Sequence, residues 1–240
     1  MYISRVELDI YNRRKIRDLT HLGAYHNWVE QSFREDNGVR SRKLWRIDKI
    51  NDKKYLLLVS EEKPDLKLLE KYGVTGSAVT KEYDAYISKI KNGMKLRFRL
   101  VTNPVHAVME DGKRGSEKPH ITAEFQKKFF MERTIKNGFE VNEDEVNIVE
   151  RGFELLRKSG SKPVKVVKAT FEGVLTVVDE DKFKLLLESG FGKKKAYGFG
   201  VFPTYAGMIL NFVKSIVKIK GISIVILPIK VVFPSIIIPL

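Results

Sequence analysis

The sequence contains no cysteine, and it has only four histidines and two tryptophans among its 240 residues. Without cysteine the chain forms no disulfide, and thiolate zinc sites, iron–sulfur clusters and cysteine nucleophiles are excluded. No two histidines have a metal-ligand spacing with a carboxylate, and Glu143–Glu145 is more typical of a helix start than of a metal site. We therefore expect no metal and no cofactor.

Long apolar runs are also missing. The segment 207–240 is rich in isoleucine, valine and leucine, but Pro228, Pro234 and Pro239 interrupt it. No uninterrupted run there reaches the roughly 20 residues that a membrane-spanning helix needs. The opening stretch Met1–Glu7 carries charge among its apolar residues and is unlike a signal peptide. We expect a cytoplasmic protein with no membrane partner.

Basic residues are in large excess. Lysine and arginine number 44 against 30 acidic residues, which gives a formal net charge of +14. High net charge with few hydrophobic residues is typical of disordered chains, but here hydrophobic residues make up 43% of the chain, which is enough for a packed core. A strong positive excess on a folded chain favours a polyanionic partner, either nucleic acid or an anionic membrane surface.

The stretch Gly190–Gly200 concentrates four glycines and three consecutive lysines. It follows a predicted helix, Asp179–Ser189, and precedes a predicted strand, Ala196–Thr204. That order is the reverse of a dinucleotide-binding fingerprint, and the Gly-Lys-Ser/Thr ending of a phosphate-binding P-loop is absent. Exposed backbone N–H groups and lysines suit the backbone of a polyanion. A flexible turn with solvated lysines is the alternative.

The order of predicted elements repeats a β-α-β-β-α-β pattern twice. The first set begins with the strand Tyr2–Ile10 and a helix that starts at Asp18 or Thr20 and ends at about Phe33. It continues with the strands Arg42–Ile50 and Lys53–Ser60, the helix Asp65–Tyr72 and the strand Tyr83–Ile90. The second set is the strand Met94–Val101, helices over Ile121–Arg133 and from Asn142 to about Lys158, a strand or bent hairpin in Lys165–Val178, the helix Asp179–Ser189 and the strand Ala196–Thr204.

This pattern predicts an α+β fold made of tandem ferredoxin-like (RRM-like) domains, each an antiparallel sheet backed by two helices. We expect the domains to span residues 1–92 and 93–206. The second would carry a basic insert and the glycine-rich loop. Residues 207–240 fit neither unit and form an atypical hydrophobic tail.

His26 interrupts an apolar stripe on the first predicted helix, formed by Leu19, Leu22, Val29 and Phe33. Two interpretations remain open from the residues alone. His26 is either a half-buried member of the stripe held by hydrogen bonds, or a proton-transfer group that works near neutral pH.

Several stretches resemble the CasE family, the CRISPR RNA endoribonucleases of type I-E Cascade. They occur in the family's order and are Met1–Val6, Leu22–Phe33 with His26 and Trp28, Thr102–Val105, Thr170–Thr176 and the loop Gly190–Gly200. The resemblance implies binding of the repeat hairpin in precursor CRISPR RNA and one metal-independent cut by the upstream 2′-hydroxyl. It also implies that the protein keeps the product guide RNA and joins other Cascade subunits.

The resemblance also assigns site residues. His26 matches the family's catalytic histidine, and Lys195 matches a loop lysine near the RNA. A tyrosine three residues before the histidine occurs in some members. Here that position is Gly23, and the adjacent Tyr25 becomes the tyrosine candidate for catalysis. Sequence does not decide whether His26 acts as base or acid.

We expect two segments to contact RNA. One is the glycine loop, through Gly190, Gly192, Lys193, Lys194 and Gly198. The other is the basic insert within 110–120, through Lys113, Arg114 and Lys118, which follows a strand with Lys95, Arg97 and Arg99 on one face. Duplex RNA is commonly recognised through shape and phosphates, which suits lysine and arginine.

Two other functions remain possible. The chain resembles a non-catalytic RNA-binding module in its fold, although it lacks a clear Lys/Arg-Gly-Phe-Gly-Phe signature. It also has the basic body and apolar tail of a peripheral membrane protein. A cleavage assay separates the first from an enzyme, and liposome sedimentation tests the second.

Overall fold

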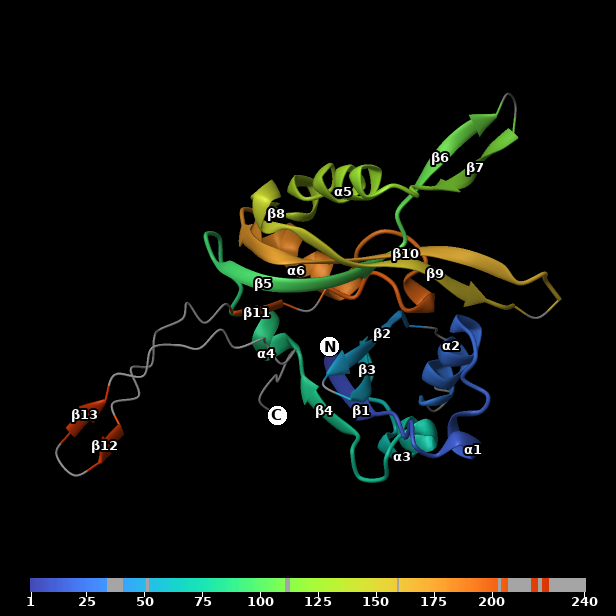
Figure 1. Cartoon of the computed structure of the whole chain (residues 1–240), viewed down its shortest axis with the longest axis horizontal. Helices are drawn as coiled ribbons and strands as arrows, with labels where there is room; N and C mark the ends of the chain where they lie inside the picture. The colour runs from blue at the N-terminus through green and yellow to red at the C-terminus, as the bar shows by residue number, and fades with distance from the viewer. Residues whose placement is uncertain are drawn as a thin grey trace.

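The computed structural model describes residues 1–33, 41–50, 52–110, 113–158, 160–202, 204–206, 217–219 and 222–224. Two α/β units follow one another along the chain, each built on an antiparallel sheet (Figure 1). The predicted α+β class is confirmed. The boundary near residue 92 stays a prediction.

The first sheet has the strand order β2-β3-β1-β4, with every neighbouring pair antiparallel. The α-helices α2 and α3 follow β1 and β3 in the chain, so the unit reads β-α-β-β-α-β as predicted. A short helix, α1, precedes α2. The strands and helices are β1 (Tyr2–Glu7), α1 (Arg13–Ile16), α2 (Leu22–Gln31), β2 (Lys43–Ile50), β3 (Lys53–Ser60), α3 (Leu66–Leu69), the 3-10 turn Glu70–Tyr72 and β4 (Val79–Glu82).

The second sheet has the order β11-β5-β10-β8, and β9 also pairs with the long strand β10. Its core is rich in phenylalanine, and the Phe130 ring stacks on those of Phe98 and Phe171 at centroid distances of 5.5 and 4.9 Å. The elements are β5 (Lys95–Thr102), α5 (Ala123–Met131), β8 (Phe139–Val141), β9 (Asn147–Leu156), β10 (Val164–Val177), α6 (Glu180–Ser189) and β11 (Thr204–Ala206).

The predicted polar insert folds as a β-hairpin. Strands β6 (Val105–Glu110) and β7 (Lys113–Pro119) pair with each other and project away from the second sheet, at the end of β5 (Figure 1). The hairpin thus extends beyond the body of the second unit, where a large partner can reach it.

Two predicted elements are wrong. Tyr83–Ile90 is not a strand, because β4 ends before it and the short helix α4 (Asp84–Ile87) follows. The buried Tyr83, Ile87 and Ile90 are spaced by four and three residues, which is one helix face. The predicted helix from Asn142 is the strand β9. Asn142 does cap a helix, but only the 3-10 turn Glu143–Glu145, before the backbone pairs with β10.

The predicted final strand Ala196–Thr204 is also misplaced. A 3-10 turn occupies Lys195–Tyr197, and strand β11 begins only at Thr204. Gly198 and Gly200 both have φ of 84°, which breaks an extended strand between the two elements. Only after these turns does the chain reach the sheet edge beside β5.

Of the predicted tail, the structure describes the paired strands β12 (Val217–Ile219) and β13 (Ile222–Ile224). The other residues of 207–240 lie outside the described part of the chain. Among the described residues, no helix has the length and apolar character needed to cross a membrane.

Candidate RNA-cleavage site

Helix α2 carries His26 and Tyr25. It begins at Leu22, later than predicted, because His21 caps it by accepting a hydrogen bond at Nδ1 from the Ala24 N–H at 3.2 Å. Trp28 is buried and donates from Nε1 to the Leu69 carbonyl at 3.2 Å, which ties the helix to the first unit. The His26 side chain, on another face, remains 31% exposed.

His26 lies against the glycine loop. Its ring centroid is 5.1 Å from that of Tyr197, at an interplanar angle of 59°, and α2 packs on the 3-10 turn that carries Tyr197. On its own helix, His26 Nδ1 is 3.8 Å from Glu30 Oε1. The first helix therefore faces the last loop, and the imidazole of His26 lies beside a segment with three lysines.

Tyr25 faces the space between the two units. Its ring stacks on Trp45 at 5.7 Å, and burial, with a smaller effect from Glu154, raises the pKa of its phenol. Tyr25 is thus a neutral hydrogen-bond donor near pH 7. At Gly23, a Cβ would lie 2.2 Å from the Arg157 carbonyl oxygen, so a tyrosine does not fit at that family position.

The glycine loop is held to the first unit by Trp45, whose Nε1 donates to the Ala196 carbonyl at 2.9 Å. A Cβ at Gly198 would lie 2.8 Å from the Trp45 ring, and one at Gly190 would lie 3.0 Å from Leu44. Both glycines are buried, and close packing against β2 accounts for them. Gly192 is exposed. RNA contact by the three glycines remains a prediction.

The loop lysines meet the hairpin. Lys193 Nζ donates to Glu117 Oε1 at 2.9 Å, and Lys194 Nζ lies 3.6 Å from Glu117 Oε2. The hydrogen bond from Lys193 holds the pKa of the Glu117 carboxyl below its usual value. The next residue, Lys118, is exposed on β7. The two segments predicted to bind RNA therefore adjoin. The side chains of Lys113 and Arg114 lie outside the described part.

Lys195 points a different way from its two neighbours. Its Nζ donates to the Ser189 carbonyl at 2.8 Å, at the end of α6. Burial, and then the nearby Arg42, lower the pKa of its ammonium group. Lys195 thus braces the loop, and its catalytic role stays a prediction.

A cavity of about 390 Å³ opens beside Tyr25 and Tyr197, between β2 and the second sheet. Trp45 and Phe199 complete its aromatic wall. A charged wall joins the two units: Arg46 Nη2 lies 2.8 Å from Asp48 Oδ2, and Arg46 also donates to the Arg99 carbonyl. Arg99 Nε in turn lies 3.8 Å from Asp48 Oδ1.

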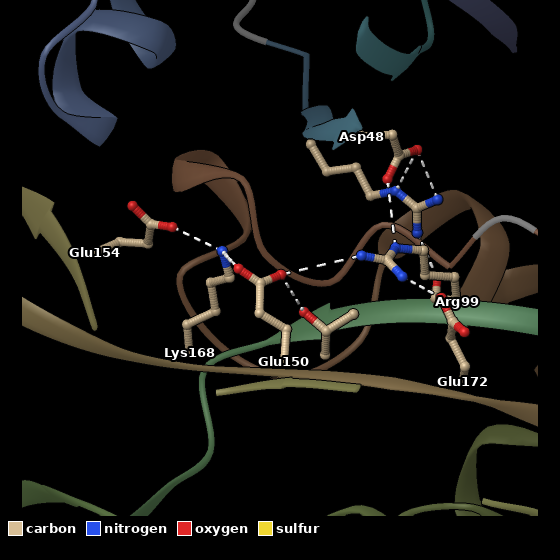
Figure 2. Close-up of polar contacts among 8 residues, drawn as sticks. Asp48, Arg99, Glu150, Glu154, Lys168 and Glu172 are labelled. Atoms are coloured by element: carbon tan, nitrogen blue, oxygen red, sulfur yellow. Dashed lines mark hydrogen bonds and ion pairs between the residues drawn. The ribbon is translucent and has the colours of Figure 1, made fainter. Parts of the chain in front are cut away.

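Figure 2 shows this charged wall, which continues from Arg99 to the acidic residues around Lys168. Lys168 Nζ lies between Glu150 and Glu154, at 2.7 and 2.8 Å from their carboxylate oxygens, and Arg99 also binds Glu172. The sequence predicts Arg99 on a basic strand face. In the structure it pairs with acidic neighbours, so it belongs to the contact between the units.

Sequence reasoning missed three residues that position the site: Trp45, Glu117 and Glu30. The first two act on segments distant in the chain, and no local pattern reports them. Glu30 follows His26 by four residues, a spacing that places both on one helix face and was readable from the sequence. Among the described residues, no group of three or more histidine or acidic side chains is placed to hold a metal.

Comparison with known proteins assigns the chain to a family. Residues 1–202 match the model of the family described as "CRISPR associated protein", so the chain belongs to that family. The CRISPR-associated endoribonuclease Cse3 of Thermus thermophilus is 28% identical over 214 residues, covering 84% of this chain and 98% of the relative.

Two solved structures are also similar. One is CRISPR endoribonuclease Cse3 bound to a 19-nucleotide RNA, with 26% identity, a TM-score of 0.71, and coverage of 85% of this chain and 100% of that one. The other is Thermus thermophilus Cse3 bound to an RNA representing a pre-cleavage complex. It has 25% identity, a TM-score of 0.70 and coverage of 85% and 98%.

Proposed function

We propose that this protein is an endoribonuclease that binds the repeat hairpin of precursor CRISPR RNA and cuts it once by 2′-hydroxyl attack, without a metal ion. One observation carries the proposal: the His26 ring, an imidazole of the kind that can transfer protons, lies 5.1 Å ring to ring from Tyr197 in the cationic glycine loop. Family membership and the RNA-bound relatives support the substrate class.

The reaction divides into three tasks. The 2′-oxygen must lose its proton and attack the adjacent phosphorus, the phosphorane charge must be stabilised, and the leaving 5′-oxygen must be protonated. In this proposal His26 carries out one of the two proton transfers. Cations of the glycine loop, Lys193 and Lys194, stabilise the negative charge once RNA displaces Glu117 from them. The products are a 2′,3′-cyclic phosphate and a 5′-hydroxyl.

Tyr25 and Lys195 have supporting roles in this proposal. Tyr25, neutral because burial raises the pKa of its phenol, donates a hydrogen bond to RNA beside the cut. Lys195 fixes the loop end through Ser189 in the free protein. The hairpin β6–β7, with Lys113, Arg114 and Lys118, contacts the phosphates of the RNA stem.

The setting follows from the same family resemblance. After cleavage the protein keeps its product and joins the other Cascade subunits in the cytoplasm. A non-cleaving RNA-binding module would share the fold and the basic surfaces, but it would have no need of a histidine beside the glycine loop.

The test is incubation of the purified full chain with the repeat RNA of its own locus, in EDTA. The expected result is one cut at the 3′ base of the hairpin, with the 5′ fragment ending in a cyclic phosphate. Binding without any cut would support the non-catalytic module, and a cut that required added Mg²⁺ would overturn the metal-free mechanism.

A further inference from the structure

We propose that Glu30 is a positioning residue for His26: it holds the imidazole in one tautomer and favours its protonated form. This inference rests on the proposed function, because it gives the histidine of that function a partner. Glu30 and His26 are four residues apart on α2 and therefore share one helix face. Glu30 Oε1 lies 3.8 Å from His26 Nδ1, so the two side chains form an ion pair whenever the ring is protonated.

The other oxygen of Glu30 is held from a different element. Lys43, on β2, places Nζ 3.3 Å from Glu30 Oε2, and the lysine side chain is only 6% exposed. Its ammonium also lies 4.7 Å from the centre of the Phe33 ring. A buried lysine is costly unless a carboxylate neutralises it. One carboxylate oxygen of Glu30 is therefore fixed by Lys43, while the other faces His26. This arrangement differs from an isolated ion pair on the surface, in which no third residue fixes the carboxylate.

The position of Glu30 within α2 supports the same interpretation. It lies in the last turn of the helix, where the helix dipole disfavours negative charge, and that turn contains no basic residue. Local helix energetics thus do not account for a glutamate there. The compensating positive charge comes from Lys43, so the carboxylate is stabilised by tertiary structure at the point where it meets His26.

A carboxylate beside Nδ1 has two effects on an imidazole. It favours the tautomer that carries its proton on Nδ1, which leaves the Nε2 lone pair for the RNA. It also stabilises the imidazolium, which favours proton donation to the 5′-oxygen. From other elements, Lys43 on β2 contacts Glu30, and Tyr197 on the loop contacts the His26 ring, with Lys158 Nζ 5.2 Å from the Tyr197 ring centre. A nearby cation disfavours an imidazolium, and a carboxylate such as that of Glu30 acts in the opposite direction.

The test is an NMR titration of the His26 ring in the full chain without RNA, comparing wild type with Glu30→Gln. The chain has four histidines, so the signal that disappears in His26→Ala identifies the ring. In Glu30→Gln we expect the titration midpoint to move to lower pH and the Nδ1–H tautomer to become less populated. Glu143→Gln is the matched control, since Glu143 faces Lys127 at 3.6 Å with 66% of its side chain exposed. It should leave the His26 signals unchanged.

Cleavage gives the second measurement. Glu30→Gln should slow cutting of the bound hairpin on the order of 10-fold, shift the pH–rate profile to lower pH and keep hairpin affinity. Glu30→Asp, which keeps the charge on a shorter side chain, should restore part of both effects. If the His26 midpoint and tautomer are the same in wild type and Glu30→Gln, the inference is overturned.

The two proposals fail separately. A wild-type protein that does not cut RNA would contradict the proposed function, yet the titration, measured without RNA, would still decide the role of Glu30. If Glu30→Gln destabilises the fold, the titration of Glu30→Asp decides: a midpoint identical to wild type with an unchanged tautomer would mean that carboxylate placement is irrelevant and contradict the positioning role.

Discussion

The two segments that meet at the candidate site are built in opposite ways. Helix α2 is a regular ten-residue helix, capped by His21 and held by the buried Trp28 and Val29. The loop Gly190–Gly200 has one 3-10 turn, and its four glycines as well as Lys194 have positive φ. The helix fixes its histidine through ordinary packing, whereas the loop reaches its place only through backbone conformations that favour glycine.

This difference teaches where each part of the chemistry can be placed. A proton-transfer group needs a fixed direction, which a packed helix supplies. Cations that follow an RNA backbone need reach, and in the proposed function this task falls to Lys193 and Lys194 on the loop, which pair with the Glu117 carboxylate in the structure. The contact between helix and loop, made by His26 and Tyr197, is where the two requirements meet.

The largest expected effect is on the helix side. His26→Ala removes a proton-transfer group but little binding surface, so we expect cleavage to fall by about 10² to 10⁴-fold with hairpin affinity kept. Single-turnover cleavage at saturating protein, with affinity measured separately, checks this. Tyr11→Ala is the control, because Tyr11 is 82% exposed and lies outside α2, the glycine loop and the hairpin, and its cleavage rate should remain near wild type. Equal cleavage rates for His26→Ala and wild type would show that His26 is only a structural member of the apolar stripe.

A smaller effect is expected from the loop backbone. Gly198→Ala combines a strained φ of 84° with a Cβ 2.8 Å from Trp45, and we expect it to cost roughly 1 to 3 kcal/mol of unfolding free energy. The control is Gly93→Ala, with a φ of 80° and nothing within 4 Å of the added Cβ. Denaturant unfolding of both variants isolates the effect of Trp45. Equal reductions in stability would show that Trp45 does not hold the loop.

The smallest expected effect is on RNA affinity and its salt dependence, and it comes from the loop lysines. Replacing Lys193 and Lys194 by alanine should weaken hairpin binding. The slope of log K against log salt should fall by about 0.7 to 0.9 for each phosphate that the protein no longer neutralises. The matched control replaces Lys127 and Lys182, which pair with Glu143 and Asp179. If both double variants kept the wild-type slope, the loop lysines would be solvated and the loop purely structural.

The sequence was informative about what local patterns encode. The repeated element order predicted the fold class, and the apolar stripe around His26 predicted a helix, whereas its contact with the last loop came only from the structure. Prediction from the sequence failed where one local pattern is compatible with two different structures. Asn142 caps a helix in either case, but pairing with β10, farther along the chain, makes the following residues a strand.

The candidate site shows the same division. His26 and the glycine loop were predicted, because the histidine and the glycine pattern are local and match a family. Trp45 and Glu117, which hold the loop from β2 and from the hairpin, act only through tertiary contacts. The buried Gly190 and Gly198 were interpreted as RNA contacts, since sequence alone does not separate a glycine that approaches a phosphate from one that approaches a tryptophan.

The most direct measurement of the central claim uses the wild-type protein and two forms of its repeat hairpin in EDTA. One form is all RNA, and the other carries a single 2′-deoxy nucleotide just before the cut. The account predicts that both bind equally, that only the all-RNA form is cut, and that its 5′ fragment ends in a 2′,3′-cyclic phosphate. Normal cutting of the deoxy form would show that water attacks the phosphorus, and would contradict the mechanism assigned to His26 and the glycine loop.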